Sequence, residues 1–236
     1  LPEPMTDAPI VVEDDGTGMT PEEVRRHYLA IAADRRVARG ERTAGKQRLV
    51  KGRKGVGKFA GLMAASEMQL ETLARGLRTQ FSVRLDDLAV VEDIEQLPIA
   101  LGEEPIDSAL HGTRIVLSGL HRGLAFPDPK RLRQILLLEY GRASGMRVFV
   151  NYKMLDVDDV EGTFHEVDLP VTGIGGTRLR FSIADNKSAS REPGIVIKVD
   201  GKAVGRPTFF GLDQQDDFPP KLLRRLYGEI DADGLR

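Results

Sequence analysis

The sequence predicts an α+β protein with two consecutive regions. Short alternating runs typical of strands recur along the chain, and other stretches carry helix caps or helical periodicity. Glycines and prolines near residues 119–129 mark a boundary between the two regions. The 236 residues can form one large domain or two smaller ones, so we expect domains at 1–120 and 121–236.

Strand and helix signals alternate in the first half. The apolar residues 10–12 run into a glycine turn, which is typical of a strand end. Thr20 and Glu23 match a capping box with Pro21 in the first turn, so a helix is expected from there to about Arg36. Further along, the pattern predicts a buried helix over 59–68 and strands over 69–73, 80–85 and 111–117.

The second half carries a similar mixture. Leu132, Ile135, Leu136 and Tyr140 recur at helical spacing, which predicts an amphipathic helix over 130–144. Strands are expected over 147–151, 177–183 and 194–200, and a short basic helix over 221–226. We therefore expect a smaller α/β region after the first domain.

Composition excludes several classes of protein. The net charge of −2 provides no overall attraction to nucleic acid or membranes. The absence of cysteine excludes disulfides and cysteine-based zinc sites, and it fits a cytoplasmic protein. No run of about 18 apolar residues is present, so no membrane helix is expected. The chain begins with Leu1 rather than Met, so we expect a fragment of a longer protein.

Residues 35–58 form a basic, glycine-rich segment with ten basic residues and one acid, Glu41. Residues 52–58 fit the first seven positions of a P-loop, but Phe59 stands where a magnesium-binding Ser or Thr belongs. Only Leu49 and Val50 are apolar just before it, so no buried strand leads into the loop. A P-loop is therefore rejected. The segment is either a solvated loop or a different phosphate-binding loop, because glycines before a helix expose backbone N–H groups.

A second glycine turn follows the first predicted strand. Asp14 opens the run Asp-x-Gly-x-Gly, which places a carboxylate at a strand end and lets the backbone approach a flat ligand. A carboxylate accepts hydrogen bonds, so it can bind the exocyclic amine of adenine. A calcium loop is rejected here and at residues 156–161, because the ligand spacing is absent. The four histidines show no metal-binding spacing either.

Three motifs together resemble the GHKL ATPase family, which includes gyrase, heat-shock chaperone, histidine kinase, MutL and MORC proteins. They are VVEDDGTGMT, GRKGVGKFAG about forty residues later, and HGTRIVL. The resemblance covers roughly residues 10–118. It implies a two-layer α/β sandwich of the Bergerat type that binds ATP and Mg²⁺, followed by a transducer-like α/β region.

The resemblance also implies the roles of particular residues. Asp14 would bind the adenine amine with support from Thr113, and residues 35–57 would form the ATP lid. The pocket around the adenine would be shaped by Gly16 and Gly18, with Met19 packed on the base. The phosphates would be held by Gly52, Lys54, Gly55, Val56, Gly57 and Lys58, although the two lysines are equally compatible with lid charge alone.

Family members also carry an earlier helix with an acidic residue and a magnesium-binding Asn. Only nine residues precede Ile10, so either that helix lies outside this chain or this fragment cannot hydrolyse ATP, and we name no catalytic base. In the second half, the resemblance makes Lys153, Lys198 and Lys202 candidates to reach a terminal phosphate, but the sequence favours a surface position for each of them.

These features predict an ATP-driven conformational switch or dimerisation clamp that hydrolyses ATP in the complete protein. ATP would bring two copies together as a homodimer, and the client could be DNA or another protein. Two alternatives remain open. One is a nucleic-acid-binding module that uses the basic residues 35–58, and the other is a histidine-type kinase.

Overall fold

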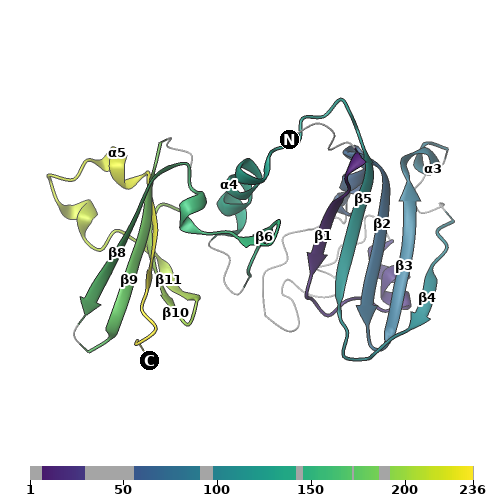
Figure 1. Cartoon of the computed structure of the whole chain (residues 1–236), viewed down its shortest axis with the longest axis horizontal. Helices are drawn as coiled ribbons and strands as arrows, with labels where there is room; N and C mark the ends of the chain where they lie inside the picture. Colours follow the sequence, from purple (N-terminus) through teal and green to yellow (C-terminus); the bar gives the residue numbers. More distant parts are fainter. Residues whose placement is uncertain are drawn as a thin grey trace. The chain divides into compact units, whose positions relative to one another are not determined.

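The computed structural model describes residues 7–29, 56–90, 98–141, 146–171, 173–185 and 192–235. The chain divides into two compact units, Leu1–Phe126 and Pro127–Arg236. Each unit is built on its own five-stranded sheet, with short helices beside it (Figure 1). The predicted α+β class is confirmed.

The sheet of the first unit is antiparallel in all four described pairings. β1 and β4 lie at its edges (Figure 1). β2 and β3 are joined by Arg75 and Gly76, whose positive φ angles of 51° and 79° suit a two-residue hairpin turn. In spatial order the strands are β1 (Ile10–Asp14), β5 (Gly112–Leu120), β2 (Ala65–Ala74), β3 (Leu77–Arg84) and β4 (Gly102–Pro105).

Three short helical segments pack against one face of this sheet. They are α1 (Pro21–Glu23), the π-helical turn η2 (Val24–Tyr28) and the 3-10 helix η3 (Val56–Met63). The predicted capping box is confirmed: the Glu23 amide donates to Thr20 Oγ1, and the Thr20 amide donates to the Glu23 carboxylate. Helix and sheet residues share a buried cluster of Val24, Leu62, Met68, Leu70, Phe81 and Val83.

The helix predicted over 59–68 is wrong in its second half. η3 ends at Met63, and β2 begins at Ala65. From Met68 onward, buried and more exposed residues alternate along β2, which is the pattern of a strand covered on one face. A run of small apolar residues suits a buried helix or a buried strand equally, so periodicity alone could not separate them. The later part of the helix expected to reach Arg36 lies outside the described residues.

The sheet of the second unit contains both pairing directions. β10 and β12 are parallel, whereas the other three pairings are antiparallel. In spatial order the strands are β11 (Lys202–Thr208), β10 (Gly194–Val199), β12 (Leu226–Asp231), β9 (Gly175–Ala184) and β8 (Gly162–Val171).

Helix α4 (Pro129–Tyr140) precedes a small hairpin of β6 (Phe149–Val150) and β7 (Lys153–Met154). The 3-10 turn η5 (Val157–Asp159) follows it, and η6 (Leu212–Gln214) and α5 (Pro220–Leu223) precede β12.

Strands over 177–183 and 194–200 are confirmed within β9 and β10. The strand over 147–151 shrinks to two residues. Four strands of this unit, β7, β8, β11 and β12, were not predicted, and neither was β4 of the first unit. The basic helix over 221–226 is wrong beyond Leu223, because Leu226 enters the sheet beside β9 and β10. α3 (Leu85–Ala89) was also not predicted.

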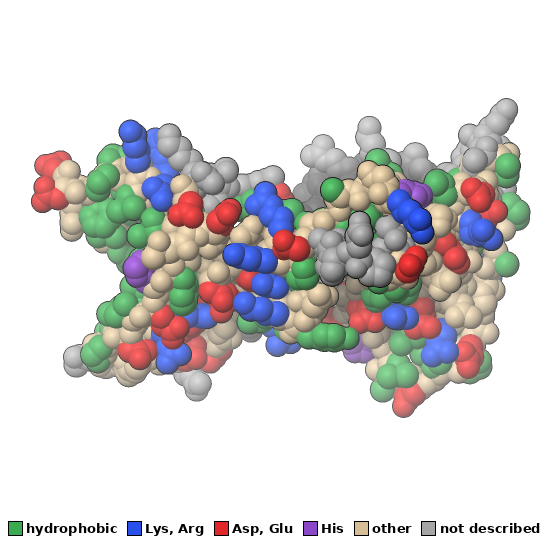
Figure 2. Space-filling view, turned by 45° about the horizontal axis from the view of Figure 1, so that its top comes forward, with side chains coloured by type: hydrophobic (Ala, Val, Ile, Leu, Met, Phe, Trp, Pro, Cys, Tyr) green, Lys and Arg blue, Asp and Glu red, His purple; other side chains and the backbone are tan. Residues whose placement is uncertain are grey.

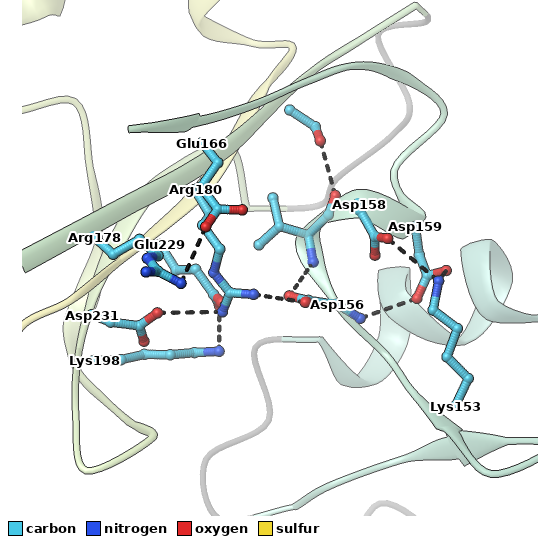
Figure 3. Close-up of polar contacts among 12 residues, drawn as sticks. Lys153, Asp156, Asp158, Asp159, Glu166, Arg178, Arg180, Lys198, Glu229 and Asp231 are labelled. Carbon is cyan, nitrogen blue, oxygen red and sulfur yellow. Dashed lines mark hydrogen bonds and ion pairs between the residues drawn. The ribbon is translucent and has the colours of Figure 1, made fainter. Parts of the chain in front are cut away.

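One ion pair connects α4 to η5. Another connects the start of η5 to the second sheet (Figure 3). Arg133 of α4 donates to Asp159 at 2.6 Å, and the Asp159 side chain is only 2% exposed. Asp156, at the start of η5, accepts from Arg180 of β9 at 2.7 Å. Arg180 also contacts Glu229, which bridges it to Lys198 of β10. Burial opposes the charge on Arg180, but the carboxylates of Glu229, Asp156 and Asp231 raise its pKa above the ordinary arginine value.

We predict that Asp159→Asn destabilises the protein by about 3–5 kcal/mol, because it leaves Arg133 without its buried carboxylate. Asp158→Asn is a matched control, since its side chain is 41% exposed and, among the described residues, pairs with Lys153 alone. That change should lower the free energy of unfolding by no more than about 1 kcal/mol. Urea unfolding followed by circular dichroism measures both, and equal losses would contradict the prediction.

Candidate functional site

A row of polar side chains crosses the first sheet on the face that the helices cover. Asp14 of β1 lies opposite Thr113 of β5, Thr113 opposite Thr72 of β2, and Thr72 opposite Thr79 of β3. Directly opposed residues of antiparallel strands point to the same face. The row passes from the exposed Asp14 through the half-buried Thr113 to Thr72 and Thr79, which are both 0% exposed.

Thr72 is the centre of the hydrogen bonds in this row. Its hydroxyl accepts from the Met19 amide at 2.9 Å. It lies 3.2 Å from the Gly112 carbonyl and 3.2 Å from Thr113 Oγ1. Thr72 therefore ties the turn after β1 to the start of β5. Thr72 was not predicted as a site residue. The feature that could have indicated it is a threonine among the apolar, inward-facing residues of one strand.

The turn after β1 is held by close backbone contacts. Asp14 Oδ1 accepts from the Gly16 amide at 2.8 Å, and His111 Nδ1 lies 2.9 Å from the Gly16 carbonyl. Gly18 has φ 64°, and a Cβ there would lie 1.9 Å from the Leu73 carbonyl oxygen. At Gly112, with φ 132°, a Cβ would lie 2.5 Å from the Asp14 carbonyl oxygen. Only glycine fits these two positions.

Asp14 presents an acceptor group at the open end of the row. Within the described parts of the chain, its carboxylate makes no hydrogen bond apart from that to Gly16. Val12 points to the same face two residues earlier, and 56% of its surface is exposed. An acceptor beside an apolar surface and the Thr113 hydroxyl can bind a flat heterocycle that carries an amine.

The second motif begins η3, and its described residues lie beside the end of η2. Lys58 Nζ donates to the His27 carbonyl at 2.6 Å, and Tyr28 Oη donates to the Lys58 carbonyl at 3.2 Å. Phe59 packs edge-on against Tyr28 and is partly buried against the core, so the residue at the P-loop magnesium position is an apolar packing residue. A Cβ on Gly57 would meet none of the described residues within 4 Å.

Several predicted site residues cannot be placed. Gly52, Lys54 and Gly55 lie outside the described residues, as do the rest of residues 30–51 and the side chain of Val56. The structure brings Asp14, Gly16, Gly18, Met19 and Thr113 together around Thr72. Gly57 and Lys58 are linked to this group through α1 and η2.

The described residues contain no group of three His, Asp or Glu side chains that could hold a metal ion. We therefore assign none of the described residues to hold the Mg²⁺ ion that the resemblance implies. Two of the predicted lysines are engaged elsewhere, Lys153 with Asp158 and Lys198 with Glu229. The side chain of Lys202 is outside the described set. No helix in the described ranges is both long and apolar enough to cross a membrane.

Comparison with known proteins gives one family match. A family model described as histidine kinase-, DNA gyrase B- and HSP90-like ATPase matches residues 1–113. No curated protein gives a significant match.

Two of the similar solved structures are topoisomerase II fragments. The ATPase region of Saccharomyces cerevisiae topoisomerase II is 13% identical, with a TM-score of 0.44 over 95% of this chain and 64% of that one. The ATPase and transducer domains of DNA topoisomerase II from Balamuthia mandrillaris are 17% identical, with a TM-score of 0.44 over 95% and 63% of the two chains. The chain thus spans less than two thirds of these structures.

The family match begins before β1 and ends at Thr113, so it contains both glycine motifs and all four residues of the polar row. Residues 1–113 thus match the family of histidine kinase-, DNA gyrase B- and HSP90-like ATPases, which is the GHKL family that the motifs of this chain resemble.

Proposed function

We propose that the first unit binds ATP, with the adenine at Asp14 and the phosphates at the start of η3. The observation that carries this proposal is the row Asp14, Thr113 and Thr72, which joins an exposed carboxylate to a fully buried hydroxyl beside the glycine turn. The match of residues 1–113 to the GHKL ATPase family supports the same ligand.

The adenine amine would donate to the free oxygen of the Asp14 carboxylate. Thr113 lies beside Asp14 on the same face, and its hydroxyl can rotate on ligand binding to turn its one proton from Thr72 to a ring nitrogen of the base. Thr72 lies next to Thr113 on the buried side of the row and positions its hydroxyl, and it also accepts a hydrogen bond from the Met19 amide. Met19 and Val12 would supply apolar contact to the ring. The pattern of one acceptor and one donor matches adenine, whose amine and ring nitrogen lie side by side.

The phosphates would meet backbone N–H groups at the start of η3. Among the described residues, nothing lies within 4 Å of the position that a Cβ on Gly57 would take, so a phosphate oxygen can approach the backbone there. Gly52, Gly55, Val56 and Lys54 would complete this site by the family resemblance. Among the described residues, we assign no catalytic base for water attack.

In the complete protein, we propose that ATP binding drives a conformational switch or a dimerisation clamp, which hydrolysis resets. Phosphoryl transfer to water depends mostly on positioning and charge stabilisation. Mg²⁺ bound with ATP would supply part of that charge stabilisation. The region after the first unit would act as a transducer. The cysteine-free composition is compatible with the reducing cytoplasm.

The nucleic-acid alternative depends on residues 35–58, nearly all of which lie outside the described ranges. On the face shown in Figure 2, basic and acidic side chains are mixed on the described part of the first unit, whereas several Lys and Arg side chains lie together on the second unit. Binding experiments with ATP and with DNA therefore decide between the two functions.

We predict that Asp14→Asn lowers ATP affinity about 10- to 100-fold, because a charged hydrogen bond is worth about 1.5–3 kcal/mol. The Asn oxygen can keep the bond from the Gly16 amide, and its NH₂ group then faces the adenine amine, donor against donor. Titration calorimetry with ATP measures the change. Asp15→Asn, an exposed neighbour, is the control and should bind ATP like the wild type.

Unchanged affinity in Asp14→Asn would remove the adenine assignment. Salt-dependent DNA binding that survives this change and is insensitive to ATP would favour the nucleic-acid alternative.

We predict opposite effects for two buried threonines in the same row. Thr72→Val removes the acceptor for Met19 and should lower the free energy of unfolding by about 1–3 kcal/mol. It should also weaken ATP binding, and Thr72→Ser should restore both. Thr79→Val is the matched control, because Thr79 Oγ1 has no hydrogen-bond partner among the described residues. Its stability should be equal to or above the wild type in urea unfolding, since a buried unpaired hydroxyl is unfavourable. Equal destabilisation by both changes would contradict the role of Thr72.

A further inference from the structure

One pair of residues joins the two helical segments that carry the ends of the proposed ATP site. α1 and η2 follow the turn at the proposed base site, and η3 begins at the proposed phosphate site. Tyr28 ends η2, and Lys58 lies in the first turn of η3. The two residues are 30 positions apart in the sequence but are in direct contact.

The contact is reciprocal. Tyr28 Oη donates to the Lys58 carbonyl at 3.2 Å, so η2 holds the backbone of η3. Lys58 Nζ donates to the His27 carbonyl at 2.6 Å, so η3 holds the backbone of η2. The same ammonium lies 5.9 Å from the centre of the Tyr28 ring, within the range of a cation–π interaction. We call these three interactions the Tyr28–Lys58 contact.

The surroundings of Tyr28 anchor this contact to the sheet. Its ring lies 6.2 Å from that of Phe59 in η3 and 5.9 Å from that of Phe81 in β3. Burial raises the pKa of Tyr28 to about 12, so its hydroxyl keeps its proton and remains a donor at neutral pH. Both ends of the ring are therefore held, one by the core and one by the η3 backbone.

The geometry points to a positioning role for the Tyr28–Lys58 contact: it sets the start of η3 for the phosphates, and Lys58 acts through η2 rather than by touching phosphate. This inference rests on the proposed ATP function. The Lys58 ammonium is directed to a helix carbonyl and an aromatic ring. Recognition of phosphate at this position is then left to the backbone N–H groups of Gly57 and Lys58, which the contact holds in place.

The test compares ligands with and without phosphates. A non-hydrolysable ATP analogue and adenosine are titrated into the full chain by calorimetry, for the wild type, Tyr28→Phe, Lys58→Met and the double variant. Two controls match the chemistry. Arg26→Met removes one positive charge from the same helix at a 72% exposed side chain, and Tyr152→Phe removes a hydroxyl from a 98% exposed tyrosine.

If the contact positions η3, Tyr28→Phe and Lys58→Met each weaken analogue binding by about five- to tenfold, the value of one hydrogen bond. The double variant is no weaker than either single one, because both changes break the same unit. Adenosine binding stays within about twofold in every variant, and so does analogue binding in both controls. Lys58→Arg keeps a cation and should recover part of the lost affinity.

Three results would overturn the inference. In the first, Lys58→Met weakens analogue binding while Tyr28→Phe does not, which makes Lys58 a phosphate contact. In the second, the two losses add in the double variant. In the third, Tyr28→Phe weakens adenosine as much as the analogue and lowers the thermal unfolding temperature, which makes Tyr28 a purely structural residue. A wild type that binds neither ligand would instead refute the proposed ATP function, and the inference with it.

Discussion

The hydroxyl of Thr72 connects three segments that the candidate site requires, namely the turn after β1, the start of β5 and β2 itself. It is fully buried, so each of its hydrogen bonds replaces one that water would otherwise make. The arrangement depends on the register of β2 against β5, because a slip of one residue would turn Thr72 to the opposite face. The position of Asp14 follows from this register, since β1 pairs with the other edge of β5.

The glycines of the first motif have a structural reason that does not involve a ligand. Gly18 and Gly112 lie where the backbone of the turn approaches β2 and β1 too closely for any side chain. Gly57 is different, because a Cβ there would meet none of the described residues. The two motifs therefore contribute differently. The glycines of the first allow the close backbone packing that positions Asp14, and Gly57 of the second leaves its own backbone accessible.

Ion pairs between charged side chains connect the elements of the second unit. Arg180 contacts carboxylates from the start of η5 and from β12 (Figure 3). Arg133 pairs with Asp159 and so connects α4 to η5. The buried apolar cluster there is small, with five residues. The acidic stretch at 156–161, tested in the sequence as a calcium loop, instead supplies partners to arginine and lysine. Two of the three lysines predicted to reach a phosphate are paired within the unit.

The sequence alone determined the α+β class, the family that residues 1–113 match, the capped start of α1 and the strands β1, β3 and β5. These follow from local signals: alternation, caps, and glycine motifs whose spacing is unusual. Only the tertiary structure revealed that residues 65–68 belong to a strand, that Leu226 enters a sheet, and that Thr72 and Tyr28 connect distant motifs. The physical reason is that local sequence reports which face of a segment is apolar, whereas partners of a buried hydroxyl or carbonyl depend on strand register and helix placement. A threonine in an apolar strand and a tyrosine in a short helix carry no local sign of what they will bind.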